Sequence, residues 1–121
     1  MATINTGLGG PQDVGEGSFR GSQLTAGNYD DGSVRVNITS VFGSQGINFF
    51  GNNYTSIYIN TNGLITFAGP VTTYTPSNIA NLGYPAIAPY WTDINVTSGS
   101  ATGANNIYWD LDPANERVTI T

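Results

Sequence analysis

Residues 56–67, SIYINTNGLITF, decide the fold class, because they hold two β-rich runs joined by Asn62-Gly63. Asn-Gly is the pair most typical of a two-residue hairpin turn between antiparallel strands. A two-residue loop places Tyr58 opposite Phe67, and an aromatic cross-strand pair contributes roughly 0.2–1 kcal/mol over an alanine pair. The stretch therefore predicts a β-hairpin.

The same register puts Ile57, Ile59 and Leu64 on the face opposite Tyr58, so both faces of the hairpin are partly apolar. Such strands suit the inside of a sandwich better than an open sheet. Other runs with strand patterns are SVRVNIT (33–39), INFF (47–50), YPAIAPYW (84–91), NIYWDLD (106–112) and RVTIT (117–121). Turn residues at 51–53 close the INFF run.

Counting these runs, we predict an all-β fold, a sandwich or barrel-like arrangement of about seven short, mostly antiparallel strands. One helical turn is expected in TPSNIANLG, with Thr75 as N-cap, Pro76 at the first helical position and Gly83 past the end. Residues 1–32 are rich in glycine with few apolar anchors, so we expect an N-terminal arm at 1–32 and the β domain at 33–121.

Composition excludes several classes of function. Only 9% of residues are charged, the net charge is −5, and Arg20, Arg35 and Arg117 are the only cations. Nothing would neutralise a run of phosphates, so nucleic-acid binding is disfavoured. No apolar run approaches the roughly 20 residues of a membrane span, so membrane insertion is not expected. The Thr-, Asn-, Ser- and Gly-rich composition resembles that of bacterial surface and secreted proteins.

The chain lacks histidine, cysteine and lysine, which removes the commonest general bases, nucleophiles and metal ligands. A pair of carboxylates could still act as acid and base, as in glycosidases. No nucleophile motif accompanies any of the acids, so we expect a protein that is not an enzyme. The carboxylates weighed are Asp30, Asp31, Asp93, Asp110, Asp112 and Glu116.

The segment DLDPANE (110–116) is a candidate calcium site. Hard cations take oxygen ligands, and a tight turn could bring several together. The segment lacks the glycine and glutamate spacing of an EF-hand, and it also fits an ordinary hairpin turn. NYDDGS (28–33) is a weaker candidate. The predicted ligands are Asp110, Asp112, Asn115 and Glu116.

Large aromatic residues occur as two adjacent pairs, Tyr90-Trp91 and Tyr108-Trp109. They could form a platform on which a sugar stacks. Aromatic residues in short strands are more often part of the core, since each buries 150–250 Å². Both interpretations stay open on the sequence alone.

Taken in order, these segments resemble the nidogen-like (NIDO) domain of nidogen, alpha-tectorin and large bacterial secreted or adhesive proteins. The family's NG-x-I-x-F hairpin corresponds to residues 62–67. Its aromatic-Trp-x-Asp segment corresponds to residues 90–93, and its following strand contains Ile107 and Tyr108. Asn95 departs from the pattern where many members carry a second acid, which weakens a metal site at Asp93.

The resemblance further implies that members continue past RVTIT with more strands. We therefore expect the domain to be incomplete after Thr121, with Val118 and Ile120 pairing with another strand. It also implies an extracellular or cell-surface module for adhesion or protein–protein interaction, with a protein partner or self-association.

Two alternatives remain. One is a subunit of a surface filament that assembles by strand addition. The other is a calcium-dependent glycan-binding module that uses Tyr90, Trp91 and the Asp110 turn. The interaction residues predicted across these alternatives are Tyr90, Trp91, Val118 and Ile120.

Overall fold

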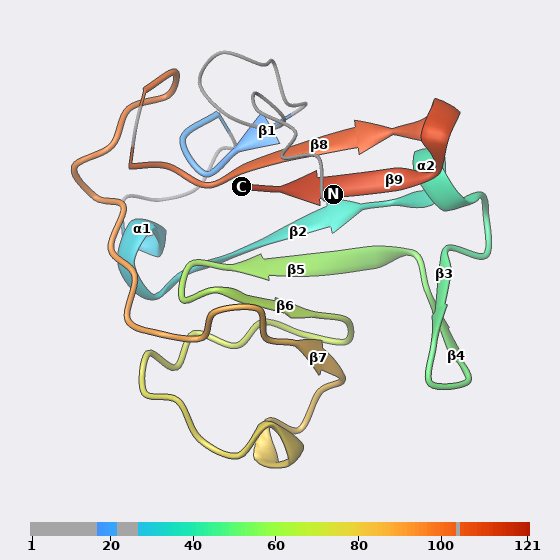
Figure 1. Ribbon diagram of the computed structural model, residues 1–121, viewed down its shortest axis with the longest axis horizontal. Helices are drawn as coiled ribbons and strands as arrows, with labels where there is room; N and C mark the ends of the chain where they lie inside the picture. Colours follow the sequence, from blue (N-terminus) through green and yellow to red (C-terminus); the bar gives the residue numbers. More distant parts are fainter. Residues whose placement is uncertain (1–16, 22–26, 104) are drawn as a thin grey trace, which may run out of the picture.

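The computed structural model describes residues 17–21, 27–103 and 105–121. Within these ranges, nine short strands form three antiparallel sheets (Figure 1). The predicted all-β fold of short antiparallel strands is confirmed, and the described strands close no barrel.

The predicted hairpin is the centre of the larger sheet, whose strand order is β2-β5-β6-β7. Val34 and Val36 are buried and pair with Ile59 and Ile57, as their alternation with polar residues predicted. The other face of this sheet carries polar side chains such as Arg35. The strands are β2 (Ser33–Asn37), β5 (Ser56–Asn60), β6 (Leu64–Thr66) and β7 (Ala86–Ile87).

The hairpin loop has three residues, so the predicted two-residue loop is wrong. Asn60 pairs with Leu64 and Tyr58 with Thr66, a shift of one residue. Gly63 has a φ of 80°, and its amide donates to the Asn60 carbonyl at 3.1 Å, as in a type I turn followed by a left-handed residue. The shift moves Leu64 to the face of the sheet that carries Tyr58 and Thr66, where it is still fully buried, and the predicted aromatic cross-strand pair does not form.

The smaller sheet has the order β1-β8-β9 and lies above the larger sheet in Figure 1. The predicted strands in NIYWDLD and RVTIT are confirmed as β8 and β9. Among the strands that the structure describes, β9 pairs only with β8, and none lies on its other edge. The strands are β1 (Gly17–Ser18), β8 (Tyr108–Asp112) and β9 (Arg117–Ile120).

A two-stranded ribbon of β3 (Ile47–Phe49) and β4 (Asn52–Tyr54) extends to one side of the sheets (Figure 1). Its turn is made by Phe50 and Gly51, which have φ values of 49° and 84°. The predicted turn at 51–53 was placed too late, because Asn52 and Asn53 already pair in β4. The Phe50 side chain is 88% exposed at the tip.

The core lies between the two larger sheets. Phe19 is fully buried beside β1, and its ring meets the edge of the Trp109 ring at a centroid distance of 6.3 Å. Trp109 is therefore a core residue. Of the two interpretations that the sequence left open, core packing and a sugar-stacking platform, the first holds for Trp109. The buried cluster consists of Phe19, Val34, Val36, Ile38, Ile57, Ile59, Phe67 and Trp109.

The predicted helical turn is present as the 3₁₀ helix η1 (Ile79–Asn81), but it begins later than expected. Its N-cap is Asn78, whose side chain accepts a hydrogen bond from the Ala80 amide, and not Thr75. Three further short helices were not predicted as helical, because one turn is too short for a helical period to show, although η2 lies in the hairpin turn expected within DLDPANE. They are α1 (Asn28–Asp31), α2 (Thr39–Phe42) and the 3₁₀ helix η2 (Pro113–Asn115).

The described part of the predicted N-terminal arm contains β1 and α1. Ser18 pairs with Tyr108, and Phe19 contributes to the core. The rest of the arm, residues 1–16 and 22–26, lies outside the described residues, so the boundary at residue 32 stays a prediction.

Candidate functional site

Three consecutive polar residues at the tip of the central hairpin are almost fully buried: Asn60, Thr61 and Asn62 are 1%, 0% and 1% exposed. Each fastens a different segment to the sheet. The Asn60 Oδ1 accepts from the Val71 amide at 2.9 Å, and the Thr61 hydroxyl donates to the Asn28 carbonyl at 2.9 Å. The Asn62-Gly63 pattern predicts only a turn residue at position 62, so this role was not predicted.

Asn62 gathers the acidic residues of two distant segments. Its Nδ2 donates to Asp31 Oδ1 at 2.8 Å, and its Oδ1 accepts from the Ile94 amide at 2.8 Å. As a result, the carboxylates of Asp30, Asp31 and Asp93 have oxygens that all lie within 4.8 Å of one another. Asp93 is far from Asp30 and Asp31 in the sequence, and no local pattern predicts that the three carboxylates lie close together.

Such a cluster can hold a hard cation, for which carboxylate oxygens are the preferred ligands. It is also open to water, since Asp31 and Asp93 are exposed and Asp30 is half-buried. Without a cation, the three negative charges repel one another at this distance, moderated by solvent.

The predicted calcium turn is occupied by internal contacts. The Asp112 carboxylate accepts from the Asn115 amide at 3.2 Å and from Asn115 Nδ2 at 2.7 Å, and it forms an ion pair with Arg117 at 2.9 Å. The hydrogen bond from the Asn115 side chain, the backbone bond and the Arg117 charge together hold the pKa of Asp112 below its usual 3.8, against a smaller opposing effect of burial.

The other predicted ligands lie at the same end of the β8–β9 hairpin. Glu116 ends η2 with a left-handed φ of 49° and is exposed, while Asp110 pairs with Thr119 in the ladder. These contacts stabilise the turn without a cation. Calcium binding by Asp110, Asp112, Asn115 and Glu116 stays a prediction.

Tyr90 and Trp91 differ in exposure. Tyr90 is 72% exposed, whereas Trp91 is half-buried and donates its Nε1 to the Thr73 carbonyl at 2.9 Å. The Trp91 indole therefore fastens the 71–75 loop. A role of these two residues in binding a partner or sugar stays a prediction.

Val118 and Ile120 present their backbone groups at the open edge of β9. Thr121 exchanges both backbone hydrogen bonds with Tyr108, at 2.7 and 3.0 Å. Because bonded and non-bonded pairs alternate in an antiparallel ladder, Thr119 also bonds to β8, and the N–H and C=O groups of Val118 and Ile120 point away from it. Among the described strands, none pairs with this edge.

Two adjoining apolar hollows lie along β9, with volumes of about 300 and about 170 Å³. Ile65 and Ile120 line both, Val118 lines the smaller, and Tyr90 lines the larger. We call them together the β9 groove. A strand added to the open edge would place every second side chain on the same face as Val118 and Ile120, toward this groove.

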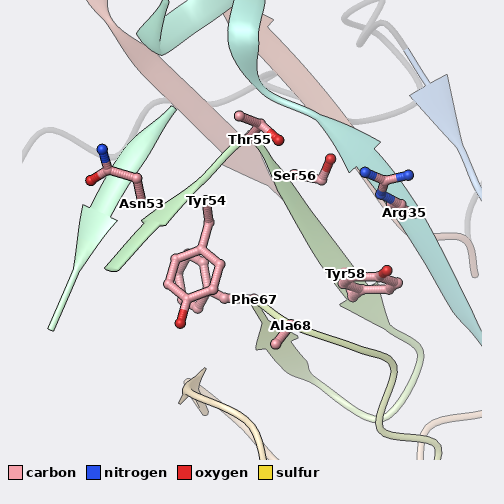
Figure 2. A pocket seen from close by; sticks show the side chains of 8 residues that line it. All are labelled: Arg35, Asn53, Tyr54, Thr55, Ser56, Tyr58, Phe67 and Ala68. Atoms are coloured by element: carbon pink, nitrogen blue, oxygen red, sulfur yellow. The ribbon is translucent and has the colours of Figure 1, made fainter. Parts of the chain in front are cut away.

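A third hollow, which we call the Arg35 pocket, lies on the other face of the larger sheet and has a volume of about 210 Å³ (Figure 2). Arg35 and Tyr58 are opposite each other on β2 and β5. On the other side stands the Tyr54 ring, 5.2 Å from that of Phe67. The full lining is Arg35, Asn53, Tyr54, Thr55, Ser56, Tyr58, Phe67 and Ala68.

None of the helices among the described residues has the length and apolar character needed to cross a membrane.

The comparisons with known proteins give one match. A family model described as NIDO related matches residues 17–106, most of the chain. The matched range includes β1, the central hairpin and the acidic cluster, and it begins inside the predicted N-terminal arm. No curated protein and no solved structure matches.

Proposed function

The chain belongs to the NIDO-related family, and from that premise we propose that it is a non-enzymatic extracellular module that binds a protein partner by strand addition to β9. Domains of this family are typically extracellular modules of larger proteins. The absence of histidine, cysteine and lysine from the sequence supports a binding role over catalysis.

One observation carries the proposal: the open edge of β9 lies beside an apolar groove. The outward groups of Val118 and Ile120 offer main-chain hydrogen bonds, which give affinity in β-augmentation. The groove offers apolar sites for alternate side chains, which give specificity. The partner segment is therefore extended, with apolar residues at every second position.

Hydrogen exchange tests this directly. The probe is a synthetic peptide of alternating valine and threonine with lysines at its ends. In the free chain, we expect the amides of Val118 and Ile120 to exchange fast, because no described strand bonds to them, while Thr119 is already bonded to β8. We expect the peptide to slow exchange at Val118 and Ile120 alone. Unchanged exchange at both amides with saturating peptide would contradict the proposal.

A matched pair of lysine variants controls the test. Ile120→Lys places a charge in the groove and abolishes the protection. Thr119→Lys adds the same charge on the opposite face of β9, so it leaves the protection in place. Equal effects of the two variants would mean that the groove is not used.

The same edge supports a second candidate, a filament subunit. β2 and β7 are the outer strands of the larger sheet, so both sheets have an outer edge that no other described strand covers. A contact between unlike edges of successive copies forms an open filament when the rotation between copies does not close a ring. Light scattering after size exclusion, at several concentrations with and without calcium, distinguishes the two. A molar mass that rises with protein concentration, and that Ile120→Lys keeps at the monomer value, favours the filament. A monomer at all concentrations rejects it.

A further inference from the structure

The Arg35 pocket contains a positive charge with no acidic counterpart. Arg35 is exposed on β2, and none of the residues that line the pocket is acidic. No ion pair or hydrogen bond joins Arg35 to another described residue. In a chain of net charge −5, this is a local region of positive charge that attracts anions. A guanidinium matches the two oxygens of a carboxylate, with which it forms paired hydrogen bonds.

A second, independent observation also points to a ligand. Ser56 is 7% exposed and lines the pocket, and its Oγ is buried without a hydrogen-bond partner among the described residues. A buried hydroxyl without a partner is unfavourable and rare in native proteins. The oxygen itself is almost inaccessible, so a polar group bound in the pocket would supply the missing partner once the Ser56 hydroxyl rotates to face it.

The remaining lining fits a sugar rather than a bare carboxylate. The Tyr54 ring provides a flat apolar wall, and Tyr58 adds a phenolic hydroxyl. Asn53 also lines the pocket, and its Oδ1 accepts from Asn48 Nδ2 at 2.8 Å. The volume of about 210 Å³ is below the roughly 300–1,000 Å³ of sites for drug-sized ligands, which suits a single ring.

We propose that the Arg35 pocket binds one carboxylate-bearing sugar unit, such as a uronic acid. Arg35 binds the carboxylate, Ser56 and Tyr58 bond to ring hydroxyls, and the sugar face packs on Tyr54. This site lies on the opposite face of the sheet from the β9 groove, and its function does not depend on strand addition.

Titrations followed by amide chemical shifts test the proposal on the whole chain, with three probes. Sodium glucuronate carries both the sugar and the carboxylate, methyl glucoside the sugar alone, and sodium acetate the carboxylate alone. We expect glucuronate to bind at least about tenfold more tightly than either, with shifts around Arg35 and Ser56. Its affinity should fall as salt is added, because the site is exposed.

Each other outcome overturns the assignment. Equal binding of acetate and glucuronate would make this a simple carboxylate site, and equal binding of methyl glucoside would remove the role of the charge. No local shifts at tens of millimolar glucuronate would mean that no sugar site exists.

Variants separate the roles of the two key residues, and the amide spectrum shows whether each one folds. Arg35→Gln should weaken glucuronate binding about tenfold or more, and Ser56→Ala should weaken it less. Arg117→Gln makes the same change in net charge outside the pocket and should leave the affinity unchanged. An Arg35→Gln variant that binds like Arg117→Gln would contradict the proposal.

Discussion

The Asn62 side chain donates a hydrogen bond to Asp31 across 31 positions of sequence, with Nδ2 and Oδ1 2.8 Å apart. Through its Oδ1, the same amide also holds the Ile94 backbone. One residue thus joins the central hairpin, the end of α1 and the 92–94 segment. The acidic cluster exists because of this junction.

Asn62→Ala should lower the free energy of unfolding by about 2–4 kcal/mol, since it leaves several polar groups without partners. Urea denaturation at pH 7 measures the change. Asn62→Asp is the informative comparison, because it keeps the acceptor for Ile94 but places a carboxylate against Asp31. The free energy of unfolding that Asn62→Asp loses at pH 7 should be partly recovered at pH 3, where the new carboxyl group is largely protonated. A stability unchanged by Asn62→Ala would show that the junction is dispensable.

Gly63→Ala should destabilise the fold by more than about 2 kcal/mol. The residue has a φ of 80°, and an added Cβ would lie 2.0 Å from the Tyr90 carbonyl oxygen. Gly83→Ala is the matched control, because its φ is 76° but no atom lies near the added Cβ. It should cost about 1 kcal/mol from backbone strain alone. Similar losses at both positions would mean that the contact with Tyr90 has no effect.

Phe19→Ala should cost about 3–5 kcal/mol, the usual range for a buried phenylalanine. This variant tests whether the predicted arm is energetically part of the β domain. Phe50→Ala removes an equal side chain at an 88% exposed position and should change stability by less than about 0.5 kcal/mol. Thermal or urea unfolding gives both values. If Phe19→Ala were as mild as Phe50→Ala, residues before 33 would be an appendage.

The turn between β8 and β9 should lose stability in acid. The pKa of Asp112 is lowered in the folded chain, mainly by the Asn115 side chain, so its ionised form stabilises the fold. That contribution is fully present above the unfolded pKa of about 3.8 and is lost as pH falls through the lower folded pKa.

Asn115→Ala should therefore lower the melting temperature at pH 7, and the difference from the unaltered chain should shrink below pH 3.5. Melting curves followed by circular dichroism from pH 2 to 7 measure both. Added calcium tests the predicted metal site in the same experiment. If calcium raises the melting temperature of the unaltered chain but not that of Asn115→Ala, the turn binds a cation. If the difference in melting temperature between the two chains does not change with pH, the Asp112 charge does not stabilise the turn.

The sequence by itself determined the fold class and most of the strands. The alternation of Val34, Val36 and Ile38 with polar residues sets the buried face of β2, because side chains in a strand point to opposite faces in turn. Asn62-Gly63 marked the central hairpin, since few other pairs tolerate such a turn. It did not determine the loop length, because a left-handed glycine fits both a two-residue and a three-residue loop.

Only the tertiary structure decided what meets across long distances in sequence. No local pattern relates Asp31 to Asp93, Arg35 to Tyr54, or Val118 to Ile65, because each pair comes together through the packing of separate segments. The polar run of Asn60, Thr61 and Asn62 looks like a solvent-exposed turn in sequence, yet it is buried. Hydrogen bonds to three distant segments satisfy its polar groups, and those partners exist only in the folded chain.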